Sequence, residues 1–500
     1  MSGEAMMRKI FIGLLMSAFV FAWACPDLLV AGETPYQPTW ESLTKHPDPA
    51  WFDDAKFGIY FHWGVYAVPA FGNEWYPRNM YQKGSAENKH HLQKYGPLST
   101  FGYKDFIAAF KAEKLDPDAW AELFEKAGAK FAGPVAEHAD GFAMWASALA
   151  DWNAARLGPK RDVVGEMARA IRKRNMKFIA TFHHQWLWGW YPTSDPAADA
   201  SDPAYAGLYG PANPPTAFDY AAPKPRPTAE FCRAWEGKVK EVIDKYQPDL
   251  IWFDSRLAII DEAYRTDLLA YYYNQARAWG REVAVTYKGT DLPRGAGIVD
   301  LERGRMAKKT DFKWLNDDSI DWKSWGYVED ASYKSVDRLV DELVDIVSKN
   351  GNLLLNIGPK ADGTIPEPVK ERLLGIGAWL KLNGEAIYGT RPWETFGEGP
   401  TQVTEGHFGE EKIKDFTAED IRFTTKGSVL YAICLAWPDK QVVVKSLAAD
   451  RKLPFGEIGE VRMLGVEKPL KWSRDEKGLS IEMPPAKPCD CAVVLKITGK

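Results

Sequence analysis

From about Trp51 to Tyr388, short apolar runs alternate with longer segments of helical period, and this alternation restricts the fold more than any other feature of the chain. Parallel strands joined by helical crossovers produce such a pattern, and seven or eight such units suit a closed (β/α)8, or TIM-type, barrel. The alternative is an open, doubly wound sheet, but no glycine-rich phosphate motif follows the first strand. We therefore expect a barrel.

The expected elements follow from the two periods. Strands are predicted at residues 57–61, 131–135, 178–182, 250–253, 283–286, 298–301 and 353–357. Helices are predicted at residues 116–127, 162–174, 228–246, 263–279, 336–349 and 368–383. The stretch 195–227 is rich in Pro, Ala and Tyr without a clear period, so we expect a long surface loop near the active face.

The pattern changes after Trp393. Shorter apolar runs separated by turn-forming residues predict strands at 429–434, 441–445, 460–464, 479–482 and 491–497. Several short strands at this spacing indicate an antiparallel β-sandwich. The expected organisation is therefore a catalytic barrel at 40–393 followed by a β-sandwich domain at 394–500, in keeping with a chain of 500 residues.

The N-terminus has the layout of a secretory signal peptide. Two basic residues precede an apolar run, residues 10–24, that ends in a small-x-small cleavage site. The run is too short to span a membrane comfortably, and no second long apolar run follows, so no stable membrane insertion is expected. We expect residues 1–24 to be removed and the protein to be exported, periplasmic or extracellular, with Cys25 as a candidate for a lipid anchor.

The composition restricts the classes of partner. The formal net charge of −5 argues against nucleic-acid binding, which usually needs a basic face. Five cysteines are too few and too scattered for a disulfide framework, and they show no zinc-like spacing. The chain has 21 tryptophans; many can be core residues, but flat aromatic faces also stack on the C–H faces of sugars. No oligomeric state is indicated.

Polar residues follow the expected strands. Asp254 comes directly after the strand that carries Trp252. In β/α barrels the C-terminal ends of the strands form the active face, so a carboxylate there suggests catalysis, although Asp is also a common helix N-cap. Other residues at or near such positions are His62, Glu74, Trp75, His138, His183, His184, Lys288, Asp300 and Glu302.

Two chemistries fit this set of residues. Histidines and carboxylates could hold a divalent metal for hydrolysis, but no HxH or HExxH pair occurs, and tryptophans are poor neighbours for a hydrated metal. Alternatively, two carboxylates could flank a glycosidic bond while histidines and tryptophans bind the hydroxyls and faces of the sugar. The aromatic content favours the sugar.

Several long motifs occur in order at residues 56–70, 74–76, 137–145, 158–162, 248–254, 350–359 and 384–393. Among them are the segments His62-Trp63-Gly64 and Pro248-Asp249 through Asp254. Together they resemble glycoside hydrolase family 29, the α-L-fucosidases, over roughly residues 40–393. The architecture of that family, a catalytic barrel followed by a β-sandwich, agrees with the interpretation above.

The resemblance implies retaining hydrolysis of terminal α-L-fucosides through a covalent intermediate, acting on fucosylated oligosaccharides or glycoconjugates. No cofactor and no metal are expected. Asp254 occupies the nucleophile position; we assign Glu302 as the acid/base, with Asp300, Asp317 and Glu329 as alternatives. The residues expected to bind the sugar are His62, Glu74, Trp75, His138, His183, Trp252, Lys288 and Trp314.

Two positions depart from the family's pattern. Ala139 stands where a second histidine often follows His138, and Lys288 stands near the position of an arginine. Losing one hydroxyl-binding histidine would remove about 1 kcal/mol net, which could change the preferred L-sugar or linkage. The alternative functions are therefore an α-L-galactosidase or other L-sugar glycosidase on the same fold, and a non-catalytic carbohydrate-binding barrel.

Overall fold

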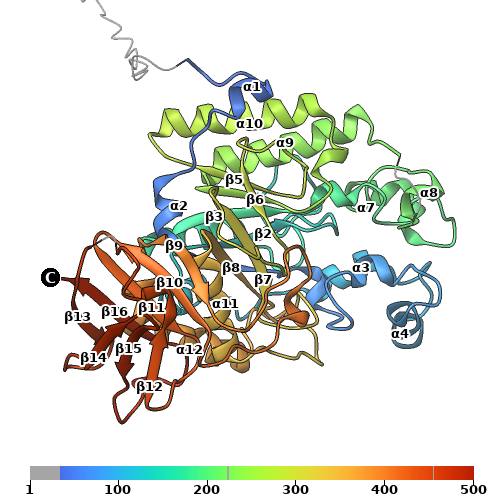
Figure 1. Cartoon of the computed structure of the whole chain (residues 1–500). Helices are drawn as coiled ribbons and strands as arrows, with labels where there is room; N and C mark the ends of the chain where they lie inside the picture. Colours follow the sequence, from blue (N-terminus) through green and yellow to red (C-terminus); the bar gives the residue numbers. More distant parts are fainter. Residues whose placement is uncertain (1–33, 222–224, 454) are drawn as a thin grey trace, which may run out of the picture. The chain divides into compact units, whose positions relative to one another are not determined.

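Eight parallel strands close into a barrel in the structure, a computed structural model that describes residues 34–221, 225–453 and 455–500 (Figure 1). The strands are β1 (Phe57–Phe61), β2 (Phe131–Glu137), β3 (Lys177–Phe182), β4 (Leu250–Phe253), β5 (Ala284–Lys288), β6 (Ile298–Asp300), β7 (Trp314–Ser319) and β8 (Gly351–Ile357). They follow one another in chain order, and β1 pairs with both β2 and β8. The predicted barrel is confirmed. The expected signal peptide and Cys25 lie outside the described residues.

The six predicted helices are present with small shifts at their ends: α5 (Pro117–Lys126), α6 (Val163–Lys173), α9 (Ala229–Tyr246), α10 (Glu262–Trp279), α11 (Val336–Ser348) and α12 (Glu367–Asn383). Several start sharply because a short polar side chain accepts a hydrogen bond from a first-turn N–H, as Asp116, Asp162, Thr228 and Ser335 do. Within the described residues, none of the helices has the length and apolar character needed to cross a membrane.

Shorter helices lie in the connections. The α-helical ones are α1 (Trp40–Leu43), α2 (Ala50–Ala55), α3 (Tyr76–Asn79), α4 (Ala86–Lys94), α7 (Ala206–Tyr209) and α8 (Pro215–Phe218). The 3₁₀ helices are η1 (Val65–Ala67), η2 (Tyr103–Ala109), η3 (His184–Leu187), η4 (Asp199–Ser201), η5 (Pro203–Tyr205), η6 (Leu257–Ile259), η7 (Gly384–Ala386), η8 (Glu410–Lys412) and η9 (Lys445–Leu447).

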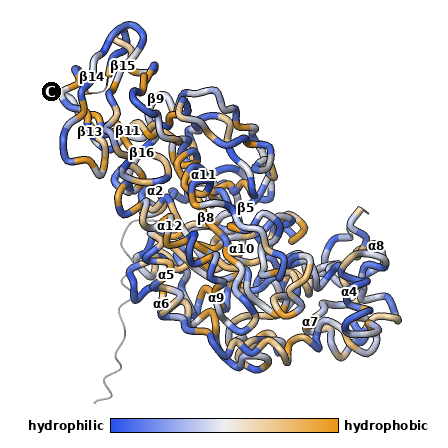
Figure 2. Tube along the Cα trace, turned by 90° about the horizontal axis from the view of Figure 1, so that it is seen from below, coloured by the Kyte–Doolittle hydropathy of each residue, from blue (hydrophilic) through white to orange (hydrophobic). Residues whose placement is uncertain are grey.

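The barrel strands are buried on both faces. In β1, Tyr60 belongs to the cluster inside the barrel together with Trp252, whereas Ile59 and Phe61 belong to the larger cluster beneath the helices. Figure 2 shows the corresponding hydrophobic residues along β8 and the helices α11 and α12. Strands covered on both faces lose the alternation of polar and apolar residues, which explains why they are continuous apolar runs in the sequence.

The strand β7 is missing from the predicted set because its sequence is polar. It reads Trp-Leu-Asn-Asp-Asp-Ser, yet all six residues are buried. The polar side chains are tolerated because they have partners: Asn316 donates to two backbone carbonyls, Asp317 accepts from Tyr60 inside the barrel, and Asp318 accepts from Lys334 outside it. An apolar-run criterion cannot find such a strand.

The stretch 195–227 has more regular structure than the long surface loop expected for it, although Tyr220 brings it to the active face as predicted. It contains η4, η5, α7 and α8, and Tyr209 is fully buried. The carboxylate of Asp199 orders this region by accepting hydrogen bonds from Tyr81 at 2.6 Å and Tyr209 at 2.5 Å.

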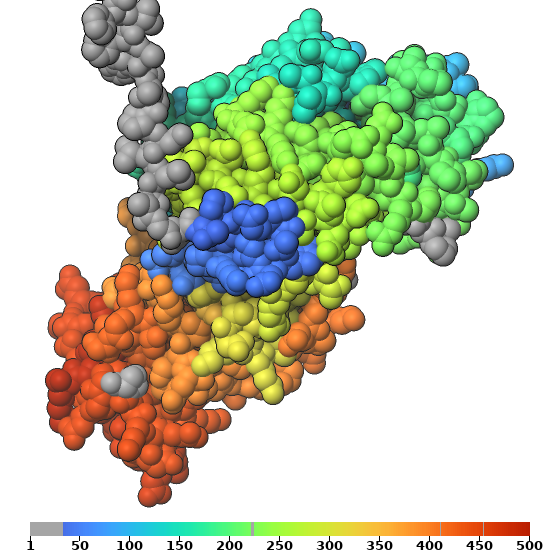
Figure 3. Space-filling model, turned by 90° about the horizontal axis from the view of Figure 1, so that it is seen from above, coloured from blue at the N-terminus to red at the C-terminus, as the bar shows by residue number. Residues whose placement is uncertain are grey.

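The chain packs on the barrel from Tyr36 onward, a few residues before the predicted domain start at residue 40. The backbone N–H of Tyr36 donates to Asn274 of α10 at 2.9 Å, and the ring of His46 stacks on Tyr273 with 3.7 Å between centroids. Figure 3 shows this blue segment lying against the yellow-green surface of the helix region.

The C-terminal domain is antiparallel, as predicted, with a five-stranded sheet in the order β13-β16-β11-β10-β9 and a three-stranded sheet in the order β12-β15-β14. The strands are β9 (Arg391–Glu398), β10 (Ile421–Lys426), β11 (Val429–Cys434), β12 (Gln441–Val444), β13 (Ile458–Met463), β14 (Trp472–Asp475), β15 (Gly478–Glu482) and β16 (Val493–Gly499). The strands β9, β10 and β14 are additional to the predicted ones. The predicted domain boundary at 393/394 falls inside β9.

A buried ion cluster joins the two domains. Asp345 of α11 accepts from Lys349 of the same domain at 2.8 Å and from Arg422 of β10 at 2.6 Å, and Arg305 lies 3.8 Å away. Burial opposes ionisation of Asp345, but the Lys349 and Arg422 charges outweigh it and hold its pKa well below the usual range.

We expect Asp345→Ala to lower the free energy of unfolding by about 3–5 kcal/mol, because it leaves buried cations without their counter-charge. Urea denaturation followed by circular dichroism measures the change. Glu482→Ala is the control, since Glu482 and Lys471 form a pair that is mostly exposed, and its loss should have little effect. Equal midpoints for the two variants would show that the cluster does not stabilise the fold.

Candidate active site

A cavity of about 450 Å³ opens at the C-terminal ends of the barrel strands. All of the predicted site residues except Trp314 line it: His62, Glu74, Trp75, His138, His183, Trp252, Asp254, Lys288 and Glu302. Residues scattered over 240 positions of sequence converge because parallel strands in a barrel end on one face.

The structure does not place Trp314 in this cavity, so that part of the prediction is wrong. Trp314 is the first residue of β7 and therefore lies at the opposite end of the strand from the active face. It is fully buried in the core, and its indole N–H donates to the carbonyl of Lys349 at 3.0 Å. Trp63, another aromatic residue at a strand end, packs instead against Phe110 and Trp120.

Asp254 is held by three polar contacts at the end of β4. One carboxylate oxygen accepts from the backbone N–H of Ser255 at 2.7 Å, and the other accepts from His183 Nδ1 at 3.1 Å. The ammonium of Lys288 lies 3.3 Å away. Burial opposes ionisation, but Lys288 and His183 outweigh it and hold the pKa of Asp254 well below its usual range. Asp254 is therefore a carboxylate near neutral pH.

Glu302 has the opposite character. It follows β6 and contacts the Lys288 ammonium at 2.6 Å. Burial raises the pKa of Glu302 to about 7, because the attraction of Lys288 only partly offsets it and the charges of Asp317 and Asp254 add to it. The two carboxyl groups thus have pKa values pushed apart, which is how environments separate a proton donor from a nucleophile.

Lys288 binds both of these carboxyl groups and a third, that of Asp317, at 3.2 Å. Its ammonium also lies 4.8 Å from the centre of the Trp252 ring. Since one nitrogen atom contacts oxygens of both Asp254 and Glu302, these oxygens can be no more than about 6 Å apart. The pair can therefore act on the same bond.

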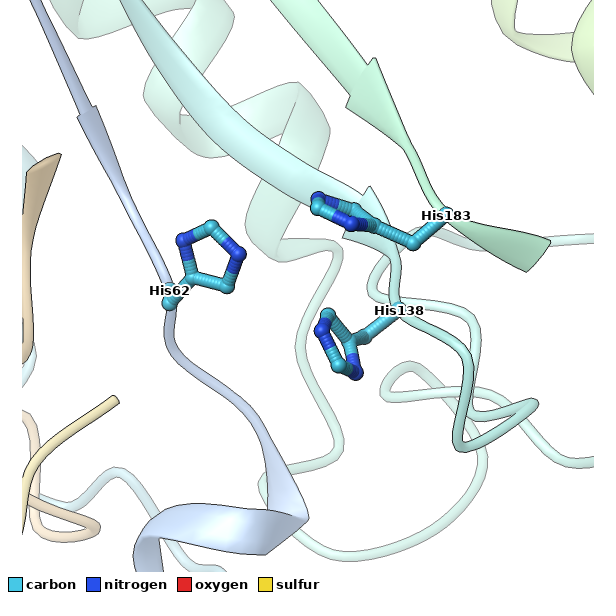
Figure 4. A group of neighbouring side chains, drawn as sticks. All are labelled: His62, His138 and His183. Carbon is cyan, nitrogen blue, oxygen red and sulfur yellow. The ribbon is translucent and has the colours of Figure 1, made fainter. Parts of the chain in front are cut away.

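Three histidines form the floor of the cavity, from the ends of β1, β2 and β3 (Figure 4). One ring nitrogen from each of His62, His138 and His183 lies within 4.8 Å of the others. His62 Nδ1 donates to Asn356 Oδ1 at 2.8 Å, which leaves Nε2 as an acceptor. Burial lowers the pKa values of His62 and His138 well below the usual value, so both rings are neutral at pH 7.

Imidazole nitrogen atoms can bind either a metal or sugar hydroxyls. His183 Nε2 and His138 Nδ1 are buried and have no hydrogen-bond partner among the described residues, so they are ready to bind a polar ligand. The nearby charges do not decide between the two, because Asp254 raises the pKa of His62 and Lys288 lowers it. The aromatic residues among the cavity lining, such as Trp75 and Trp252, favour a hydroxylated sugar.

Aromatic rings and Glu74 complete the cavity wall. Trp75 contacts Trp186 and Tyr220, with ring centroids 5.4 and 5.9 Å apart. The carboxylate of Glu74 accepts from the backbone N–H of Trp325 at 2.9 Å. Aromatic faces beside oriented polar groups are typical of sites that bind a sugar ring.

The alternatives to Glu302 are less suitable. Asp300 is fully buried and does not line the cavity; it accepts from the Trp252 indole at 2.9 Å. Asp317 reaches the cavity, but it is buried beneath Lys288 and accepts from the Tyr60 hydroxyl at 3.2 Å. Glu329 is exposed and lies outside the lining.

Several lining residues are absent from the sequence prediction. Tyr60 is inside β1 rather than after it, and Trp325 comes from the connection after β7, the strand that the apolar pattern does not reveal. His407 and Phe408 come from the segment after β9, outside the predicted barrel. Ala139 is buried in the hydrophobic core and does not line the cavity, so its missing imidazole leaves no added space there.

Comparison with known proteins agrees with this geometry. A family model described as alpha-L-fucosidase matches residues 26–385, and a model described as alpha-L-fucosidase C-terminal domain matches residues 414–498. The tissue alpha-L-fucosidases of Rattus norvegicus and Homo sapiens are each 34% identical to this chain, covering 93% of it and 92% of their own lengths. The crystal structure of Thermotoga maritima alpha-fucosidase has a TM-score of 0.73 at 32% identity, covering 93% of this chain and 100% of that one.

The fold and the paired carboxyl groups in its cavity define a glycoside hydrolase built on a (β/α)8 barrel. The chain belongs to the alpha-L-fucosidase family. The family resemblance of the sequence is confirmed.

The pH dependence of kcat/KM follows from the two carboxyl groups. Asp254 stays ionised across the neutral range, whereas Glu302 loses its proton as the pH rises through about 7. With Glu302 as the predicted proton donor, kcat/KM should fall over the same range. In Glu302→Gln the residual activity on the same substrate should lack this alkaline decline, because an amide does not titrate in this range. Steady-state kinetics from pH 4 to about 9 measure both profiles. An unchanged decline in Glu302→Gln would assign it to another group.

Proposed function

We propose that this enzyme hydrolyses terminal α-L-fucosides by double displacement with retention of configuration, using Asp254 as nucleophile and Glu302 as acid/base. The observation that carries the proposal is the contact of both carboxyl groups with Lys288. It limits the separation of the two contacting oxygens to about 6 Å, which is compatible with the ~5–5.5 Å between the carboxyl groups of retaining glycosidases.

In the first step, Asp254 attacks C1 of the fucose from one face of the ring. The bond between C1 and the glycosidic oxygen breaks, and that oxygen takes the proton of Glu302. The raised pKa of Glu302 supplies this proton near neutral pH, and the low pKa of Asp254 supplies the charged nucleophile.

Lys288 stabilises both ends of this step. Before it, the negative charge is on Asp254; afterwards Asp254 is an ester, and the charge is on Glu302. The same ammonium lies within 3.3 Å of an oxygen of Asp254 and 2.6 Å of an oxygen of Glu302. Because the cation serves whichever carboxyl group is charged, the charge can move without a large change in electrostatic energy.

In the second step, water replaces the leaving group. Glu302, now a carboxylate, takes a proton from the water while the oxygen attacks C1 from the face opposite Asp254. The bond between C1 and Asp254 breaks, which regenerates the carboxylate. Two inversions at C1 give fucose with the original configuration.

The three histidines are proposed to bind the hydroxyls of the sugar. Their side chains line the cavity and follow three adjacent strands (Figure 4). His183 also forms a hydrogen bond with Asp254. The similar proteins support fucose as the sugar. Two curated relatives are tissue alpha-L-fucosidases, and structures of the Thermotoga maritima enzyme have been solved in complex with fucose and with a mechanism-based inhibitor.

Export to the periplasm or the extracellular space is part of the proposal. It rests on the basic and apolar layout of residues 1–24. Mass spectrometry of the N-terminus of the mature protein tests it: a chain that begins at Cys25 supports cleavage after Ala24, and an intact Met1 contradicts it.

Asp254→Ala should lower kcat by about 10⁴-fold or more while leaving circular dichroism unchanged, because the covalent intermediate cannot form. Added azide can enter the vacated space and attack C1 of an aryl α-L-fucoside with a good leaving group. The product should be β-L-fucosyl azide, with inverted configuration, identified by NMR. Near wild-type turnover, or an azide with retained configuration, would contradict the role of Asp254.

A further inference from the structure

A second cavity of about 510 Å³ adjoins the catalytic one. The two share Glu302 and Phe408 in their linings, together with Glu74, Trp75 and Trp325. Since the acid must contact the glycosidic oxygen, the group that leaves with this oxygen must lie beside Glu302. The second cavity meets the catalytic one at this residue and has a similar volume, which gives room for a further sugar.

Phe408 stands at the junction with an unusual exposure. Phe408 is 61% exposed. Large apolar residues that are exposed beside a cavity commonly mark a binding surface. Its backbone has φ +52°, in the left-handed region that disfavours residues other than glycine. The backbone N–H donates to the carbonyl of Glu302 at 2.9 Å, which holds the main chain of Phe408 beside Glu302.

The surrounding segment is attached firmly to the loop that carries the acid. Gly406 and Arg305 exchange backbone hydrogen bonds of 3.1 and 3.3 Å, and Gly409 N–H donates to the carbonyl of Arg303 at 3.0 Å. His407 Nδ1 accepts from the backbone N–H of Glu302 at 3.0 Å. The segment Gly406–Glu410 is therefore held against the loop that carries Glu302 by several hydrogen bonds.

The chemistry of the second cavity fits an uncharged sugar. Phe408 and Trp322 offer aromatic faces for the C–H groups of a pyranose, and Asn73 and Asn79 offer amides for its hydroxyls. The cations in the lining are already paired: Arg303 with Glu410 at 2.6 Å, and Lys323 with Asp330 at 2.9 Å. An anionic leaving group would find no unpaired cation among these residues.

We propose that the second cavity is the leaving-group site, that it binds the uncharged pyranose to which fucose is attached, and that Phe408 is its stacking surface. The inference rests on the proposed function, because it assumes that Glu302 protonates the leaving group. It makes Phe408 a determinant of specificity supplied from outside the barrel.

Transfer to an added sugar tests this site separately from hydrolysis. With α-L-fucosyl fluoride, Asp254 bonds to C1 as the bond between C1 and fluorine breaks; fluoride and the proton of Glu302 pass to the solvent, which leaves the fucosyl-enzyme with Glu302 as a carboxylate. Methyl β-D-galactopyranoside then competes with water: its hydroxyl oxygen bonds to C1, Glu302 takes the hydroxyl proton, and Asp254 is released. The ratio of transfer to hydrolysis depends on binding of the acceptor, because both reactions use the same intermediate and the same base.

In Phe408→Ala the ratio of transfer to hydrolysis should fall about tenfold, because the acceptor loses its stacking surface while water competes for the same intermediate. Phe408→Trp should retain the ratio. Leu149→Ala is the matched control, since Leu149 is also 61% exposed but lies outside both cavities. A ratio in Phe408→Ala equal to that of the control would overturn the inference.

Two further outcomes separate the claims. No hydrolysis of the fluoride by the wild-type enzyme would refute the proposed function itself, whatever Phe408 does. Preferred transfer to methyl β-D-glucuronide over the galactoside would refute the assignment to an uncharged sugar. High-performance anion-exchange chromatography measures both products in the same reaction.

Discussion

The contact of one buried ammonium with three carboxyl groups is the interaction on which the site depends. Lys288 is 4% exposed and lies against Asp254, Glu302 and Asp317. Without it, three carboxyl groups in one cavity would repel one another, and burial would favour the neutral form of each. With it, Asp254 remains ionised while Glu302 can keep its proton. Lysine also differs from arginine here, because a compact charge can lie between groups that a planar guanidinium would bind side by side.

The barrel supports this ammonium with a strand that is polar by necessity. From β7, Asp317 points inward to Lys288, and Asp318 points outward to Lys334. Lys334 in turn contacts Glu410 at 2.7 Å, and Glu410 pairs with Arg303, the residue after Glu302. The inner face of β7 thus supports Glu302 through Lys288, the ion-pair partner of Glu302. The outer face supports it through Arg303, the next residue in the chain. This is the physical reason why an apolar strand could not occupy the position of β7.

The sequence was sufficient to predict the elements that show a hydrophobic period and the site residues that directly follow such strands. Seven strands and six helices were predictable from their periods, and Asp254 and His183 were predictable because polar residues after buried strands meet on one face. Trp314 was wrongly predicted to line the cavity because β7 was not recognised as a strand. Without the strand, the sequence does not show at which of its ends the tryptophan lies. His407 was not predictable, since it follows β9 in the other domain and reaches the site through backbone contacts that leave no pattern in the sequence.

This last residue bears on why the β-sandwich accompanies the barrel. The segment Gly406–Glu410 lies between β9 and β10, two neighbouring strands of the C-terminal sheet. Those strands are anchored to the barrel by Arg422 of β10 and Asp345 of α11. The segment therefore begins and ends on a surface that is fixed relative to the catalytic loop, so its ends are already held when it contacts Glu302. Ordering such a connection costs less conformational entropy than ordering a free loop, because both ends are already constrained. The C-terminal domain is thus a structural part of the catalytic site.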